Sequence, residues 1–200
     1  MTGKPFSEYA ARNSRPILDV LQIELSSSTR VLEIGSGTGQ HAVLFATALS
    51  HVVWQTSDRV DNHEGINAWV DDAALPNLLP PLAFDVLDAD IAVESFDAVY
   101  SANTAHIMSL PAVERMFALI GTALSSGGTF CLYGPFRQNG DFNTASNERF
   151  HRSLQSQNPA MGIRHIEELD DLGDLNNLQR LRLYAMPANN HLAVWKKAVR

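Results

Sequence analysis

The hydrophobic pattern of the chain predicts strands that alternate with helices. Short apolar runs predict strands over residues 31–34, 51–57, 82–86, 96–102, 129–133, 181–185 and 192–195. Apolar residues at helical spacing predict helices over residues 40–49, 61–75 and 111–124, and from about Asn147 and Ile166. This alternation is typical of an α/β fold with a mostly parallel sheet. The short link between the last two runs predicts an antiparallel hairpin.

Serine and proline positions predict two further features of the chain. Ser14 and Pro16 predict the start of a helix, with the serine as its cap and the proline in its first turn. Pro76, Pro80 and Pro81 predict a rigid loop ahead of the third strand. Residues 1–28 are therefore expected to form a helical arm that precedes the first strand.

The segment V-L-E-I-G-S-G-T-G, from Val31 to Gly39, joins the first strand to a helix through a glycine-rich turn. Glycine allows sharp turns and lets a ligand lie against bare backbone. The start of the helix adds free N–H groups and a positive dipole end. A dinucleotide fingerprint, G-x-G-x-x-G, would need its third glycine at position 40, where this chain has Gln40. The layout predicts a cofactor site, and Gln40 argues against NAD.

The same segment, read as E-x-G-x-G-x-G from Glu33, resembles motif I of the class I S-adenosylmethionine (SAM) methyltransferases. From about residue 12 to the C-terminus the chain also resembles the methyltransferase-like protein 26 family (uncharacterised protein family 0585). The segments that carry this resemblance are R-N-S-R-P-I-L, V-L-E-I-G-S-G-T-G-Q-H-A, W-Q-T-S-D, A-N-T-A-H-I, L-Y-G-P-F, N-E-R-F and M-P-A-N-N. The resemblance implies a Rossmann-like fold that binds SAM. Its mostly parallel seven-stranded sheet would have an antiparallel last strand and helices on both faces.

The resemblance to SAM methyltransferases implies cofactor contacts from the glycine turn and from the ends of the next strands. The candidate residues are Glu33, Gly35, Ser36, Gly37, Thr38, Gly39, His41, Asp58, Asp85, Val86 and Asn103. Asp58 follows the second strand about where a Rossmann-like fold places a ribose-binding carboxylate, although it would also serve as a helix cap. Asp85 is expected to face the adenine amino group, and Val86 to pack on the ring.

Polar and aromatic residues near the expected strand ends predict a pocket for a small-molecule acceptor. They are Asn13, Tyr133, Phe136, Asn143, Asn147, Asn189 and Asn190. An N-terminal arm commonly folds over the cofactor in SAM enzymes, which would bring Tyr9, Arg12, Asn13 and Arg15 to the site. An ordinary solvated helix explains these four residues equally well. Asn189 and Asn190 are also common turn residues.

His106 and Asn103 follow the fourth strand, and ligands of open α/β sheets bind outside the carboxyl ends of strands. His106 is the best candidate for a base, because histidine titrates near neutral pH, and a hydrogen-bonded structural histidine is the alternative. The amide of Asn103 would orient an acceptor amine or hydroxyl. Methyl transfer itself needs mainly alignment and exclusion of water.

Composition argues against several classes of protein: nucleic-acid-binding, membrane-spanning, secreted and metal-binding. The 200 residues suit a single α/β domain over residues 1–200, and the net charge of −7 argues against nucleic-acid binding driven by phosphate contacts. Cys131 is the single cysteine, no apolar run is long enough to span a membrane, and the N-terminus lacks an apolar signal core. A cytoplasmic location is therefore expected. The histidines show no metal-binding spacing.

The leading hypothesis is thus a SAM-dependent methyltransferase with a small-molecule acceptor. Two alternatives belong to other classes: a SAM-binding sensor or interaction module without transfer activity, and an NAD-dependent oxidoreductase.

Overall fold

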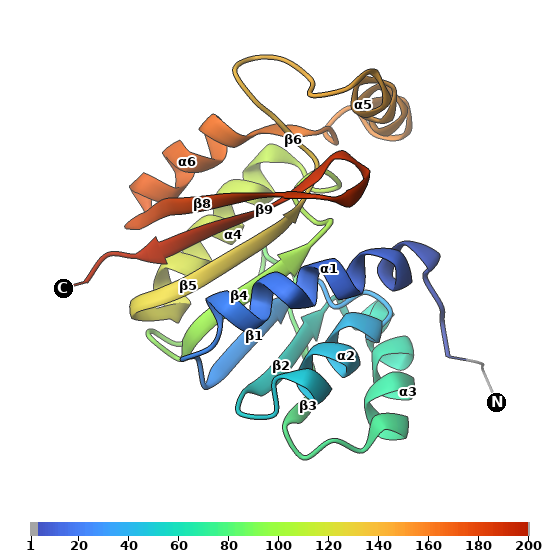
Figure 1. Ribbon diagram of the computed structural model, residues 1–200, viewed down its shortest axis with the longest axis vertical. Coiled ribbons are helices and arrows are strands. Elements are labelled where there is room, and N and C mark those ends of the chain that lie inside the picture. Colours follow the sequence, from blue (N-terminus) through green and yellow to red (C-terminus); the bar gives the residue numbers. More distant parts are fainter. Residues whose placement is uncertain (1–3, 200) are drawn as a thin grey trace.

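The computed structural model describes residues 4–199, and a twisted sheet of seven strands runs through it (Figure 1). The strands of this sheet are β1 (Arg30–Ile34), β2 (Val53–Asp58), β3 (Leu78–Ala83), β4 (Phe96–Ala102), β5 (Leu124–Gly134), β8 (Leu178–Met186) and β9 (Asn190–Lys197). Their spatial order is β3-β2-β1-β4-β5-β9-β8. Strands β1 to β5 are parallel, and β9 is antiparallel to both of its neighbours. This confirms the mostly parallel sheet with an antiparallel last strand.

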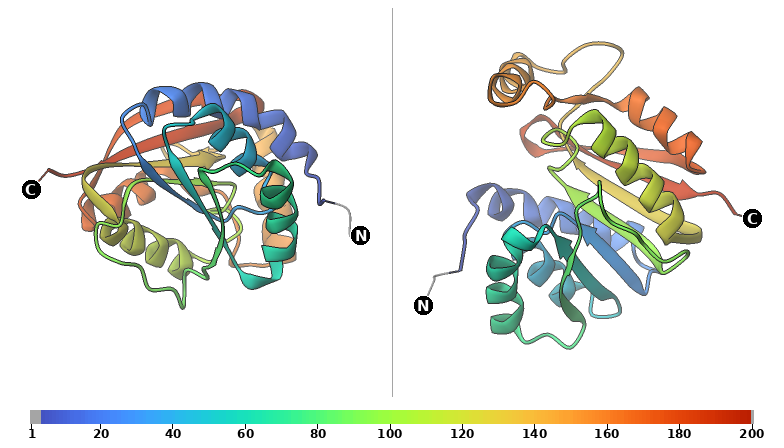
Figure 2. Two further views of the ribbon diagram at one scale, coloured as in Figure 1. Left: turned by 90° about the horizontal axis from the view of Figure 1, so that it is seen from below. Right: turned by 180° about the vertical axis from the view of Figure 1, so that it is seen from behind.

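Helices cover both faces of the sheet (Figure 2). They are α1 (Glu8–Glu24), α2 (Gln40–Ala48), α3 (His63–Ala73), α4 (Leu110–Ala123), α5 (Ala145–Gln157) and α6 (Ile166–Leu175). Helices α1 and α2 lie on one face, and α4 and α6 lie on the other. Successive residues of β1 alternate between these sides: Val31 packs in the core cluster of α1, α2 and α3, and Leu32 in that of α4 and α6.

Helix α1 begins earlier than its sequence predicts. Ser7 caps it, because its hydroxyl oxygen accepts a hydrogen bond from the backbone N–H of Ala10 (3.2 Å). The predicted start at Ser14 is therefore wrong, and Pro16 lies inside the helix. Contacts with distant residues hold the first half in place, since the Ser7 N–H donates to the side-chain oxygen of Gln40 (2.5 Å).

Strand β3 also differs from its prediction. It spans Leu78–Ala83 and contains Pro80 and Pro81, which the sequence assigned to a rigid loop. Prolines are tolerated here because β3 is an edge strand that pairs with β2 alone, so the missing N–H groups break no second ladder. As a consequence, Asp85 and Val86 follow the strand instead of ending it.

Smaller elements lie near the carboxyl ends of the strands. The 3-10 turns η1 (Val60–Asn62) and η2 (Pro187–Asn189) follow β2 and β8, and the short strands β6 (Phe136–Arg137) and β7 (Arg164–His165) pair with each other. Helix α5 lies beyond this edge of the main sheet in Figure 1. No helix within residues 4–199 is long and apolar enough to cross a membrane.

Candidate functional site

A hollow of about 1050 Å³ opens at the carboxyl ends of the strands, beneath the first half of α1. Its walls come from the turn after β1, the ends of β4 and β5, helix α5 and the link between β8 and β9. The lining residues are Ser7, Tyr9, Ala10, Arg12, Asn13, Gly35, Ser36, Gly37, Thr38, His41, Ala102, Asn103, His106, Ile107, Tyr133, Pro135, Ser146, Asn147, Phe150, Pro187, Ala188 and Asn190. The hollow thus brings predicted cofactor and acceptor residues together.

Two positions of the glycine turn need glycine for different reasons. Gly35 has φ +76°, and a Cβ added there would lie 2.6 Å from Cγ2 of Thr104, so the turn packs directly on the residues after β4. Gly37 has φ +59°, and a Cβ there would meet nothing within 4 Å. Because Gly37 also lines the hollow, its bare backbone faces open space in which a ligand fits.

Glu33 holds the glycine turn from inside the protein. Its side chain accepts hydrogen bonds from the Ser36 hydroxyl (2.9 Å) and from Nε1 of Trp54 (3.1 Å), and the residue is 2% exposed. Burial raises the pKa of this carboxyl from its ordinary value of 4.5 to about 7. Glu33 lines neither hollow, and the contact with the cofactor that its motif predicts stays a prediction.

Asp58 supports the same turn from the end of β2. Its Oδ2 accepts a hydrogen bond from the N–H of Gly37 (2.7 Å), and its Oδ1 accepts from the N–H of Arg59 (2.7 Å) and from the amide of Asn62 (2.8 Å). The carboxylate therefore fixes the backbone that lines the hollow, and it begins the turn that follows β2.

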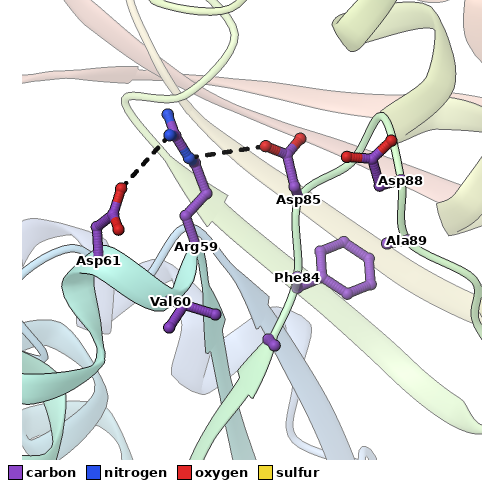
Figure 3. Close-up of a pocket in the computed structure, with 8 residues that line it drawn as sticks. Arg59, Val60, Asp61, Phe84, Asp85, Asp88 and Ala89 are labelled. Atoms are coloured by element: carbon purple, nitrogen blue, oxygen red, sulfur yellow. Dashed lines mark ion pairs between the residues drawn. The ribbon is translucent and has the colours of Figure 1, made fainter.

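A second hollow of about 370 Å³ lies just beyond Asp58 (Figure 3). Its lining residues are Arg59, Val60, Asp61, Ala83, Phe84, Asp85, Asp88 and Ala89. The Arg59 guanidinium lies 3.6 Å from the carboxylate of Asp85 and 3.5 Å from that of Asp61. Asp85 lines this hollow, and its contact with an adenine stays a prediction. Val86 packs in the core, and Phe84 supplies the apolar wall.

A chain of hydrogen bonds joins α1 to the sheet across the larger hollow. His41 Nε2 lies 2.8 Å from the side-chain oxygen of Asn13, and its Nδ1 lies 3.3 Å from the Tyr100 hydroxyl. The Tyr133 hydroxyl bonds with the side chain of Asn13 and accepts from the amide of Asn190 (3.0 Å). Burial lowers the pKa of His41 to about 4, so the side chains joined by these hydrogen bonds carry no net charge at neutral pH.

His106 and Asn103 occupy the loop after β4. Burial, reinforced by the charge of Arg164, lowers the pKa of His106 to about 4. Its ring lies edge-on to Phe150 (5.4 Å between centroids), and no side-chain hydrogen bond to the ring is found within residues 4–199. Asn103 is left-handed (φ +59°), and its N–H donates to the carbonyl of Tyr133 (2.8 Å). His106 is thus a neutral proton acceptor at the wall of the hollow.

Three asparagines predicted to bind the acceptor form hydrogen bonds with one another at the link between β8 and β9. The amides of Asn143 and Asn147 both donate to the carbonyl of Asn189 (3.1 Å each), and the Asn147 amide also donates to Oδ1 of Asn143 (2.7 Å). Of the three, only Asn147 lines the hollow, and Phe136 is buried in the core. Phe150 lines the hollow although its helical spacing favours a core position.

Comparison with known proteins places the chain in a family. The model of a family described as "Protein of unknown function (DUF938)" matches residues 4–197. The chain belongs to this family. That description carries no activity, and the narrower resemblance to the methyltransferase-like protein 26 family stays a prediction.

Solved structures of methyltransferases share the fold. An O-methyltransferase family 2 protein from Planctomyces limnophilus, in complex with apigenin, matches with a TM-score of 0.83 and 16% identity over 95% of this chain and 58% of its own. Human N-acetylserotonin methyltransferase, in complex with SAM, matches with a TM-score of 0.80 and 12% identity, over 96% of this chain and 53% of its own. An O-methyltransferase family protein from Burkholderia thailandensis matches with a TM-score of 0.80 and 11% identity, over 93% of this chain and 56% of its own. The chain spans little more than half the length of these proteins, and the likeness shows a class I methyltransferase fold.

The two hollows together offer space for an extended ligand, and the lining around His106 is uncharged. Two hollows flank Asp58, and the larger one joins bare backbone at Gly37 to the neutral ring of His106. Within residues 4–199 no group of three or more metal-binding side chains lies close enough to hold a metal ion.

Proposed function

We propose that this protein is a SAM-dependent methyltransferase that acts on a small-molecule acceptor. The observation that carries the proposal is the open backbone of Gly37 at the wall of a hollow that also contains Asn103 and His106. A ligand on the glycine turn therefore lies in the same space as the candidate base. The relationship to the methyltransferase-like protein 26 family is part of the same proposal.

The residues present fit SAM in two parts. The smaller hollow, with the carboxylate of Asp85 and the ring of Phe84, would hold the adenine. The glycine turn would hold the methionyl part in the larger hollow. Asp58 bonds with Arg59 of the smaller hollow and with Gly37 of the larger one. Its Oδ1 already accepts two hydrogen bonds and its Oδ2 accepts one, so Oδ2 would accept one more from a ribose hydroxyl.

Bound SAM supplies a methyl group made electrophilic by the neighbouring sulfonium. The chain then has to orient the acceptor, exclude water and take up any proton that the acceptor releases. His106 is available for that last task because it lines the hollow and its ring is unprotonated at neutral pH, although the lowered pKa also makes it a weak base. The amide of Asn103 would orient the acceptor beside it.

The walls favour an uncharged acceptor. Phe150, Ile107 and Pro135 are apolar, and Asn147 offers an amide. One structural neighbour is in complex with apigenin, and the name of another contains N-acetylserotonin; both are uncharged aromatic molecules, which supports an acceptor of this kind. We therefore propose a small aromatic hydroxyl compound as the first acceptor class to screen.

Calorimetric titration with SAM, S-adenosylhomocysteine and NAD in parallel tests the proposal. Selective binding of the two adenosyl ligands is expected, and methyl transfer to a member of a phenol panel should follow. Binding of the adenosyl ligands without transfer to any acceptor would favour a SAM-binding sensor. Selective binding of NAD would favour the oxidoreductase and would refute the proposal.

A further inference from the structure

The larger hollow contains a single charged side chain among residues 4–199, that of Arg12. Both histidines of its lining, His41 and His106, are neutral at pH 7 because burial lowers the pKa of each to about 4. No carboxylate within the described chain forms an ion pair with Arg12. By contrast, Arg15 on the same helix pairs with Asp19 (3.1 Å).

The guanidinium of Arg12 lies over the ring of Tyr9, with 4.8 Å between the guanidinium carbon and the ring centroid. Tyr9 also lines the hollow. Stacking on an aromatic ring leaves the N–H groups at the edge of the guanidinium free to donate. The cation is therefore held at the mouth of the hollow with unused hydrogen-bond donors.

The helix that carries Arg12 is tied to the side of the hollow formed by the glycine turn. Ser7 donates to Gln40, whose side-chain oxygen also accepts from the hydroxyl of Thr38 (3.0 Å). Asn13 bonds with His41 at the start of α2. These bonds hold the helix that carries Arg12 against the glycine turn and the start of α2. On the lining that comes from α5, Asn147 and Phe150 are uncharged.

We propose that Arg12 binds a ligand carboxylate, and that this carboxylate belongs to the methionyl part of the cofactor. The inference rests on the proposed function. A guanidinium pairs with a carboxylate through two parallel hydrogen bonds, which gives both charge and direction. In a chain of net charge −7, this local cation also offsets the repulsion that an incoming anion would otherwise meet.

A matched pair of ligands isolates the carboxylate. S-adenosylhomocysteine carries it, whereas 5′-(3-aminopropylthio)-5′-deoxyadenosine keeps the adenosine, the thioether and the amine but lacks it. Calorimetry on the full chain should show that Arg12→Met weakens S-adenosylhomocysteine about tenfold, the order expected of one partly exposed charge-assisted pair. The decarboxylated ligand should bind to both proteins within about twofold.

Two further variants act as controls. Arg15→Met removes a neighbouring arginine outside the hollow and should leave both affinities unchanged. Arg12→Lys keeps the charge and should restore part of the affinity. Circular dichroism checks that each variant is folded.

The outcomes separate this inference from the proposed function. If the unaltered chain does not bind S-adenosylhomocysteine, the proposed function fails, and the inference fails with it. If the chain binds the ligand but Arg12→Met has no effect, as it would if the carboxylate were on the acceptor, only the inference is overturned. Equal losses for both ligands would also overturn it, because Arg12 would then act on the helix alone.

Discussion

The buried carboxyl of Glu33 leads to the sharpest prediction about stability. Glu33→Gln keeps the shape and an oxygen that can accept the hydrogen bonds from Ser36 and Trp54, and it removes the charge. Burial raises the pKa of Glu33 from 4.5 to about 7. The folded chain therefore keeps a proton between these values that the unfolded chain releases, and the native protein loses stability as the pH rises through this interval.

The size of the effect follows from the pKa. One pKa unit corresponds to about 1.4 kcal/mol, so ionisation of Glu33 lowers the free energy of unfolding by about 3 kcal/mol above pH 7. Glutamine does not have this dependence. We expect the stability gained on Glu33→Gln to be larger at pH 8 than at pH 5 by about 2.5 kcal/mol.

Urea denaturation followed by circular dichroism, at pH 5 and pH 8, measures this difference. Glu148→Gln, on the outer side of α5, is the control, because its carboxylate is partly exposed and paired with Arg152. This control measures the effect of the same change at a partly exposed glutamate. A difference between the two pH values for Glu33→Gln no larger than that of the control would refute the reasoning. Because Glu33 lines neither hollow, the affinity for S-adenosylhomocysteine should change less than about threefold at pH 5, where the native carboxyl is protonated.

Three further predictions concern the site itself. Gly37→Ala should lower stability by only about 1 kcal/mol, because of its left-handed backbone, yet weaken the binding of S-adenosylhomocysteine at least tenfold. Gly35→Ala should lower stability by about 2 kcal/mol or more, because of the contact with Thr104. Equal effects of the two substitutions in calorimetry and in urea denaturation would contradict this. NMR titration of the imidazole nitrogens should show His106 unprotonated until about pH 4, so that this residue lowers stability as the pH falls from 6.5 toward 4; titration near pH 6.5 would contradict the burial argument. Asp58→Ala frees the Gly37 N–H and should weaken S-adenosylhomocysteine at least tenfold, and an unchanged affinity would remove Asp58 from the binding machinery.

Local patterns predicted most of the fold. Strand β4 spans Phe96–Ala102 and α2 begins at Gln40, as predicted, because an apolar run and a glycine turn act over a few residues. The start of α1 has a local signal, the Ser7 cap, and is also held by contacts with residues about 30 positions away, such as Ser7 with Gln40 and Asn13 with His41. A propensity argument does not include such contacts.

The sequence predicted which segments form the candidate site, but not which way their side chains point. The sequence places Glu33 and Asp58 beside the glycine turn, but it does not show that their oxygens hold the turn from within. Likewise, Asn143 and Asn189 belong to the right loops and bond with each other. The place of Phe150 in the lining of the hollow was not predicted. Helical spacing shows that such a residue lies on the apolar face of its helix, but not which surface that face contacts.

The two halves of α1 are stabilised by different forces, and this difference bears on how a ligand reaches the site. The second half is anchored by buried Ile17 and Leu21 in the core. The first half, which covers the hollow, is held largely by hydrogen bonds such as those of Ser7 and Asn13, each of net value about 1 kcal/mol. Pro16 lies between the halves and has no N–H to donate to the carbonyl of Arg12. The part of α1 over the site is therefore held less by apolar burial than the second half, and a ligand that binds Arg12 would stabilise its position by adding to those bonds.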